Sequence, residues 1–387
     1  MPLSAEHPQR VCGLDPETGR EIVVVIEQGR VKSVNFEAHG VREWLCAGFV
    51  DLQVNGFAGH DLNGLTLDIA TVGALCAAML RVGVTTFLPT LVTAPEARIL
   101  AALRVIRAAR EADPQVAHMI PGVHIEGPHI APEDGPRGAH PATEVRPPST
   151  AEFDRWQEAS GGLVKLVTLS PHWLESPAYI RHVVQAGVHV SLGHTSANAA
   201  QIAAAVEAGA RLSTHLGNGS HALLDRRHNH LWPQLADDRL TAMFIADGHH
   251  LTPDQLKVML RAKGLERSLV VSDVVALGGM PAGKYVTPIG GKVELQADGL
   301  LTLDDGTGKY LAGASLPMTA AIPLLVNQVG LTLAEAVALL TVTPGRIVGG
   351  RGALAVGQPA DLIAFRWDGS SARPEVSGVW LRGRSVT

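Results

Sequence analysis

Two apolar runs flank a helical stretch in residues 188–218, "VHVSLGHTSANAAQIAAAVEAGARLSTHLGN". Each run is short and largely apolar, which is typical of a strand covered on both faces. The alanine-rich stretch 197–208 between them predicts a helix with Ser196 as its N-cap and Gly209 at its end. A strand, a helix and a second strand in this order favour a parallel βαβ unit.

The same alternation extends over most of the chain. Eight β-rich apolar runs occupy residues 48–55, 85–90, 120–127, 164–172, 188–194, 211–218, 241–248 and 268–274. Helices are expected at 66–82, 94–112, 174–186, 197–208 and 253–263. An open doubly wound sheet is the competing architecture. The count of eight, without a GxGxxG motif after the first run, favours an α/β fold of the TIM-like (β/α)₈ barrel type.

The two ends of the chain are rich in short strand patterns. "EIVVVIEQGRVKSV" (21–34) predicts a hairpin that turns at Gln28-Gly29-Arg30, and "ADLIAFRWDG" and "VSGVWLRGRSV" near the C-terminus have the same character. Neither end has enough apolar residues for a core of its own. We therefore expect one small β-sandwich domain from residues 1–47 and 346–387, and a barrel domain from residues 48–345.

Composition excludes several classes of function. The chain has 387 residues, 46% of them hydrophobic, and a formal charge of -5 without a basic block, which argues against nucleic acid or an anionic membrane as partner. No apolar run reaches the roughly 20 residues of a membrane span, and the N-terminus lacks a signal-peptide core. Three scattered cysteines, Cys12, Cys46 and Cys76, argue against a disulfide frame. A reducing, cytoplasmic location is expected.

Polar residues follow most of the apolar runs, where the active site of a barrel lies. A single histidine or aspartate there is more often a loop residue or a helix cap, but the joint pattern is different. Glu126, His194 and His215 supply a carboxylate and two imidazoles, a normal ligand set for a catalytic zinc ion. Asp273 after the last run could accept a proton from the attacking water.

Several motifs resemble those of the N-acetylglucosamine-6-phosphate deacetylase family of the amidohydrolase superfamily. They are "HIEGPHI", "LGHTSANAAQIAAAVEAGARLSTHLGN", "IADGHHL", "VVSDVVALGG" and "LAGASLPM", and the resemblance covers nearly the whole chain. It implies a metal-dependent hydrolase of a linear amide C–N bond. The implied substrate is an N-acetylated amino sugar, first of all N-acetylglucosamine 6-phosphate, and the implied assembly is a homodimer.

The resemblance also implies roles for individual residues. Glu126, His194 and His215 match metal ligands, and Asp273 matches the general acid/base that protonates the leaving amine. His250 matches a histidine near the carbonyl oxygen or the phosphate. The implied substrate contacts are Ala139, His140, Asn218, Gly219, Arg226, Asp247, His250, Leu311, Ala312 and Gly313. One divalent ion per chain is expected, zinc first, with iron, cobalt and manganese as alternatives.

Gln53 and Asn55 in "GFVDLQVNG" (48–56) stand where many barrel hydrolases carry the His-x-His of a second metal. Neutral carboxamides are poor zinc ligands but good hydrogen-bond partners. One branch of the deacetylase family has Gln-x-Asn here and binds one metal, and this chain is similar to that branch. We therefore expect one ion, with Gln53 and Asn55 bonding a water or a group behind the ligands.

The substrate stays open, because the loop 218–234, "NGSHALLDRRHNHLWPQ", departs from the family pattern. Arg226 falls on the position of the family's phosphate-binding arginine, with Arg227 beside it. The loop could bind phosphate, select another or an unphosphorylated N-acetyl hexosamine such as the galactosamine type, or be a solvated basic loop.

Two other functions compete with deacetylation. Another amidohydrolase acting on a small amide would usually carry His-x-His on the first strand and a lysine at the end of the fourth. Lys165 lies too near the start of that run. A non-catalytic sugar-phosphate-binding barrel would have no need of Asp273 beside an open metal position.

Overall fold

The computed structural model describes residues 9–288, 290–304 and 311–386. The chain divides into two compact units. The described residues up to 50, residues 79–86 and the described residues from 318 form one unit, and residues 51–78 and 87–317 form the other. The domain boundaries predicted from the sequence stay a prediction, and residues 1–8 and 387 lie outside the described residues. No helix in the described part is long and apolar enough to cross a membrane.

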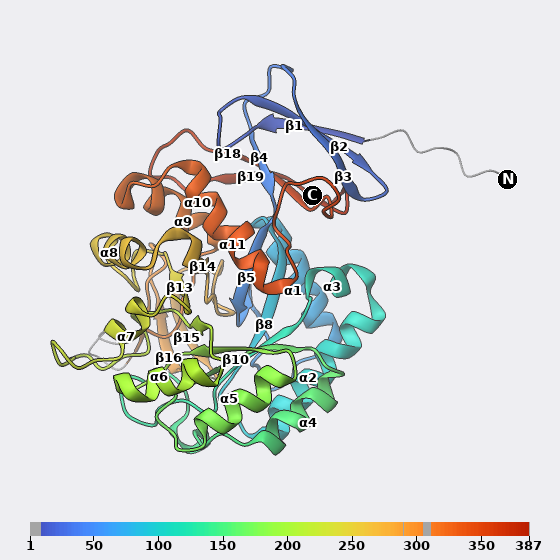
Figure 1. The fold of residues 1–387 in the computed structure, drawn as a ribbon. Helices are drawn as coiled ribbons and strands as arrows, with labels where there is room; N and C mark the ends of the chain where they lie inside the picture. The colour runs from blue at the N-terminus through green and yellow to red at the C-terminus, as the bar shows by residue number, and fades with distance from the viewer. Residues whose placement is uncertain (1–8, 289, 305–310, 387) are drawn as a thin grey trace. The chain divides into compact units, whose positions relative to one another are not determined.

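Eight parallel strands, each followed along the chain by helical or irregular segments, form the sheet that carries the site (Figure 1). They are β5 (Phe49–Val54), β8 (Val84–Val92), β9 (Val123–Glu126), β10 (Val164–Leu169), β11 (His189–Leu192), β12 (Leu212–Ser213), β13 (Thr241–Ile245) and β14 (Ser268–Val271). Every residue of β5 and β8 is buried, which explains their apolar character. The eight predicted runs are confirmed as strands, and with them the TIM-like barrel.

The first and last strands of the barrel meet through a short seam. A single parallel bridge joins Val54 to Val274. The fully buried Asp51 adds a side-chain contact, because its Oδ1 accepts the backbone N–H of Ser272 at 3.1 Å. The barrel is therefore closed by contacts that lie next to Asp273.

The five predicted helices are confirmed as α1 (Ile69–Arg81), α2 (Glu96–Ala112), α5 (Ser176–Gln185), α6 (Ala199–Ala208) and α8 (Pro253–Lys263). The predicted N-cap of α6 is wrong. Asn198, not Ser196, caps it, because the side chains of Asn198 and Gln201 each accept the other's backbone N–H, at 3.0 and 2.9 Å. Ser196 bonds Glu133 instead. Gly209 ends the helix with φ 116°, as predicted.

Several elements had no counterpart among the predictions. The helices are α3 (Pro114–Met119), α4 (Thr150–Ser160), α7 (Leu231–Ala236), α9 (Ala321–Pro323), α10 (Leu333–Leu340) and α11 (Val342–Gly345). The strands β6 (Gly56–Phe57) and β7 (His60–Asp61) form a small ribbon. An antiparallel sheet of β15 (Gly283–Thr287), β16 (Gly291–Leu295) and β17 (Leu301–Leu303) follows the last barrel strand. Its core contains Leu277, Val293, Leu295 and Leu301.

Both ends of the chain contribute to one seven-stranded sheet, in which blue and red strands of Figure 1 are neighbours. Its order is β20-β19-β18-β4-β1-β2-β3, with β1 (Gln9–Leu14), β2 (Glu21–Glu27), β3 (Arg30–Phe36), β4 (Trp44–Ala47), β18 (Leu362–Arg366), β19 (Glu375–Leu381) and β20 (Arg384–Ser385). The hairpin turn has positive φ at Gln28 and Gly29, 51° and 75°. The expected sheet built from both termini is confirmed, and its described strands lie in one sheet rather than in the two layers of a β-sandwich.

Candidate functional site

A cavity of about 510 Å³ opens among the loops that follow the barrel strands. Most of the candidate residues line it, namely Asn55, Glu126, Ala139, His140, His194, His215, Asn218, Gly219, His250, Asp273, Leu311, Ala312 and Gly313. Thr287, Val293 and Leu301 from the unpredicted three-stranded sheet complete its wall. Gln53, Asp247 and Arg226 are not among the lining residues.

Three nitrogen and oxygen donors converge in the cavity. Nε2 of His215 lies 3.0 Å from Glu126 Oε1, Nε2 of His194 lies 3.3 Å from the same oxygen, and the two Nε2 atoms are 3.0 Å apart. Ligands held about 2.0–2.1 Å from a tetrahedral zinc ion stand roughly 3.3 Å from one another. The three side chains therefore fit one divalent cation.

The environment of the donors favours the forms that bind a metal. His194 Nδ1 lies 2.7 Å from the carbonyl oxygen of Pro136, which fixes its proton on Nδ1 and leaves Nε2 free to coordinate. Burial raises the pKa of Glu126, but its interactions with the imidazoles of His194 and His215 outweigh it and hold that pKa well below the ordinary value. An ionised carboxylate and neutral imidazoles are the species that divalent ions bind.

His140 brings a third imidazole to the same place. A ligand atom of His140 lies within 4.8 Å of those of Glu126 and His194. Its Nδ1 is 2.7 Å from Thr93 Oγ1. We assign the third ligand to His215 rather than to His140, because His215 lies 3.0 Å from both other donors. His140 is then a neighbour of these three residues that lines the same cavity.

Three of the site residues hold a backbone conformation that side chains rarely adopt. His194, His215 and Asp273 have φ of 48°, 27° and 52°. Such a conformation costs about 1–3 kcal/mol per residue and persists only where the surrounding structure imposes it. All three residues follow barrel strands, where the chain turns at once and the side chain stays in the cavity. The strain supports a functional role for this part of the barrel.

Gln53 and Asn55 each hold one carboxylate of the site. Gln53 Nε2 donates to Glu126 Oε1 at 2.8 Å, and Asn55 Nδ2 donates to Asp273 Oδ1 at the same distance. Gln53 is fully buried and Asn55 is 7% exposed. The side chains that stand at the second-metal positions thus orient the carboxyl groups of Glu126 and Asp273.

Asp273 occupies an environment that favours its protonated form. It is partly accessible, but loss of hydration and the negative charge of Glu126 raise its pKa to about 8. The hydrogen bond from Asn55 acts in the opposite direction. A cation among the three ligands would also lower this pKa by attraction. The carboxyl group is therefore placed to exchange a proton near neutral pH.

His250 is oriented by Asp247 from behind the cavity wall. Asp247 Oδ2 lies 2.7 Å from His250 Nδ1, and its Oδ1 accepts the backbone N–H groups of His249 and His250 at 2.9 Å. Burial raises the pKa of Asp247, but the hydrogen bond with His250 outweighs it and the pKa falls to about 2. Asp247 thus acts through His250 and not as a lining residue.

The structure does not bring Arg226 to the cavity. Arg226 and Arg227 are exposed on the loop after Asn218, and the carbonyl oxygen of Arg226 accepts a hydrogen bond from Trp232 Nε1 at 3.1 Å. Ser220, His221 and Ala222 of the same loop line the cavity instead. The phosphate contact of Arg226 stays a prediction.

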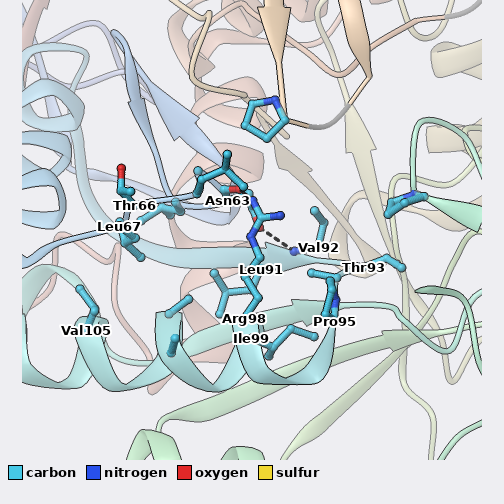
Figure 2. A pocket seen from close by; sticks show the side chains of 18 residues that line it. Asn63, Thr66, Leu67, Leu91, Val92, Thr93, Pro95, Arg98, Ile99 and Val105 are labelled. Carbon is cyan, nitrogen blue, oxygen red and sulfur yellow. Dashed lines mark hydrogen bonds between the residues drawn. The ribbon is translucent and has the colours of Figure 1, made fainter. Parts of the chain in front are cut away.

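A smaller pocket of about 150 Å³ adjoins the cavity and shares Asn63, Val92 and Pro288 with it. Figure 2 shows Arg98 extending from α2 toward Asn63, whose carbonyl oxygen it bonds. Asn63 in turn accepts the N–H of Val92 and donates to the carbonyl of Thr90, both at 3.0 Å. The side chain of Asn63 therefore pairs with backbone groups of β8, at a position shared by the two pockets.

Sequence reasoning missed Asp51, Asn63 and Thr93, whose hydrogen bonds support residues in and around the site. For Asp51 a signal was present. Asp51, Gln53 and Asn55 alternate along β5, and alternate residues of a strand face the same side. For Asn63 and Thr93 the sequence offers no comparable signal, because their partners lie far away in the chain.

Comparison with known proteins places the chain in a family. The model of the Amidohydrolase family matches residues 44–386. N-acetylgalactosamine-6-phosphate deacetylase of Escherichia coli O157:H7 is 32% identical over 88% of this chain and 87% of its own length. The human N-acetylglucosamine-6-phosphate deacetylase is 32% identical over 91% of this chain and 85% of its own length.

The fold comparison agrees. The solved N-acetyl-D-glucosamine-6-phosphate deacetylase of Mycobacterium smegmatis is similar with a TM-score of 0.85 and 29% identity, covering 95% of this chain and 96% of that one. The chain belongs to the amidohydrolase family, in the group of the N-acetylglucosamine-6-phosphate deacetylases that its motifs resemble. It is accordingly an enzyme that hydrolyses an amide C–N bond.

Proposed function

We propose that the protein removes the acetyl group from an N-acetyl hexosamine 6-phosphate, giving the amino sugar phosphate and acetate. One observation carries the proposal: Glu126, His194 and His215 lie within hydrogen-bonding distance of one another in the cavity that Asp273 also lines. The names of the relatives, which are gluco- and galacto-type deacetylases, point to the same chemistry.

We assign Glu126, His194 and His215 as ligands of one divalent ion, zinc in the first place, with iron, cobalt and manganese as alternatives. Such an ion, when bound, lowers the pKa of water and polarises a carbonyl group. The carboxamides of Gln53 and Asn55 argue against a second ion, because both are engaged with carboxylates.

The chain's own residues perform the proton transfers. Asp273 accepts a proton from the water that attacks the acetamide carbonyl, and then gives a proton to the amide nitrogen as the C–N bond breaks. Acetic acid and the neutral amine form first, and the proton of the acid then passes to the amine, so acetate and the ammonium form leave and the proton count is balanced. His140 and His250 line the same cavity and can donate to the carbonyl oxygen as negative charge develops on it.

The cavity volume of about 510 Å³ is in the range of small-ligand sites. We propose N-acetylglucosamine 6-phosphate as the substrate. The galactosamine epimer is the second candidate, because a relative that is 32% identical bears that name. The exposed loop with Arg226 and Arg227 is the proposed source of the phosphate contact.

Acetate release tests the proposal directly. The gluco, galacto and manno N-acetyl hexosamines are offered with and without the 6-phosphate, and kcat/KM is measured for each. The proposal expects the highest value for N-acetylglucosamine 6-phosphate and almost no turnover by Asp273→Asn. Comparable turnover without phosphate would refute the phosphosugar assignment, and full activity of Asp273→Asn would refute the mechanism.

We also propose that the enzyme is a cytoplasmic homodimer. The family resemblance supports the dimer, and three scattered cysteines that are free in the structure support a reducing compartment. Light scattering of the purified protein gives its mass, and a mass near the 40.7 kDa of one chain would contradict the dimer.

A further inference from the structure

Asn55 has two polar atoms, and only one of them has a partner in the described part of the chain. Its Nδ2 donates to Asp273 Oδ1 at 2.8 Å and to the Asp273 carbonyl oxygen at 3.4 Å. Its Oδ1 is buried and without a hydrogen bond among the described residues. Leaving a buried acceptor unpaired costs about 1–3 kcal/mol, so this oxygen calls for a partner that the protein does not itself provide.

The orientation of the carboxamide follows from its neighbour. The backbone carbonyl oxygen of Asp273 can only accept, and its Oδ1 also accepts, so Asn55 turns its NH₂ group toward Asp273. The Oδ1 of Asn55 then points away from that carboxyl group. Asn55 itself lines the 510 Å³ cavity together with Asp273. The oxygen therefore belongs to a side chain at the cavity wall beside Asp273 and lacks a hydrogen-bond donor among the described residues.

The scissile acetamide carries one such donor, its N–H group. We propose that Asn55 orients the substrate: its Oδ1 accepts the N–H of the acetamide while its Nδ2 holds Asp273. The inference rests on the proposed deacetylase function. This hydrogen bond brings the amide nitrogen beside the carboxyl group of Asp273, which must protonate that nitrogen before the C–N bond breaks. The amine that forms can keep the same acceptor.

Gln53 provides an internal comparison. Its Nε2 also donates to a carboxylate, Glu126, and its Oε1 is also buried without a partner among the described residues. Gln53 does not line the cavity, however. The two carboxamides therefore share their chemistry but differ in access to the substrate, and Gln53→Leu is the matched variant for Asn55→Leu.

The experiment compares the amide with an isostere that lacks the N–H. In the methyl ketone isostere, a CH₂ group replaces the N–H of the acetamide, so the compound cannot be hydrolysed and acts as a competitive inhibitor. KM and kcat for the acetamide and Ki for the ketone are measured for wild type, Asn55→Leu and Gln53→Leu. Metal content and circular dichroism are recorded, and Asn55→Ala replaces Asn55→Leu if that variant does not fold.

We expect Asn55→Leu to raise KM for the acetamide about three- to tenfold, the range for one lost hydrogen bond, while Ki for the ketone changes less than twofold. Its kcat falls as well, because Asp273 loses its donor. Gln53→Leu should shift KM and Ki together. A fall in kcat of Asn55→Leu with KM unchanged would overturn the inference. Wild type without acetate release would refute the proposed function itself.

Discussion

Asp51 and Ser272 are joined across the seam between the first and last barrel strands. Asp51 Oδ1 accepts the backbone N–H of Ser272 at 3.1 Å, and it also accepts the N–H of Gln53 at 3.2 Å. Ser272 directly precedes Asp273, whose φ is 52°. One buried side chain thus connects β5, the strand that carries Gln53, to the residue that precedes Asp273.

Replacing Asp51 should therefore affect both stability and turnover. Asp51→Ala leaves the buried N–H of Ser272 without its acceptor, which should cost about 1–3 kcal/mol of unfolding free energy. Asp51→Asn keeps an acceptor oxygen and should retain more of both stability and kcat. Urea unfolding and acetate release measure the two effects. Equal losses of stability and kcat in the two Asp51 variants would contradict the role of the acceptor oxygen. Asp68→Asn, at an exposed position, serves as the control.

Gln53→Leu should weaken metal binding without changing the charge of the protein. The variant removes the 2.8 Å hydrogen bond to Glu126 Oε1, and a lost partner of a ligand typically costs ten- to hundredfold in metal affinity. Competition with a chelator measures the affinity in wild type and variant. Wild type should hold one ion per chain, so two tightly bound ions would contradict the assignment of a single-metal centre.

Arg226 and Arg227 give a paired test of phosphate recognition. Both are exposed on the same loop, but only Arg226 falls on the family's phosphate position. Arg226→Ala should raise KM for the phosphorylated sugar at least tenfold and leave KM for the unphosphorylated sugar unchanged. Arg227→Ala should have a small effect on both. Equal effects of the two substitutions would indicate that the loop acts only through its general charge.

His129 should make the protein sensitive to acid. It is fully buried and packed between Trp156 and Tyr179, with ring centroids 5.5 and 5.1 Å away. Burial lowers its pKa from 6.5 to about 4. Between these values the unfolded chain binds a proton that the folded protein does not, so stability falls as pH falls from about 6.5 to 4, by at most about 1.4 kcal/mol per pH unit.

His129→Asn removes one of several buried histidines whose pKa burial lowers to about 4, the others including His124 and His230, and should reduce this dependence. It also lowers stability overall by disturbing the packing. Urea unfolding at several pH values between 4 and 7 measures the slope. His39→Asn, at an exposed position, should keep the slope of wild type. An unchanged slope in His129→Asn would assign the acid sensitivity to other groups.

The site residues that could be found from the sequence lie at the ends of strands. Glu126, His194, His215 and Asp273 follow apolar runs, and parallel strands bring such positions to one edge of a barrel. The hydrogen-bond partners of Gln53 and Asn55 could not be found in this way. They are 73 and 218 residues away, and only the closed barrel brings them together.

Other parts of the fold escaped prediction for different physical reasons. The N-cap of α6 was misplaced because Ser196 has good capping chemistry, but Asn198 has the glutamine at the third position that completes a reciprocal pair. The sheet β15–β17 combines short strands with charged and glycine residues, so its alternation is weak. Its apolar residues form a core only together with Leu277, which lies outside these strands in the sequence.

The contact between the first and last barrel strands also bears on how the active structure forms. Asp51 and Ser272 are 221 residues apart, so their contact forms only after nearly the whole barrel has been assembled. An ordered Asp273 therefore depends on contact between the first and the last strand of the barrel.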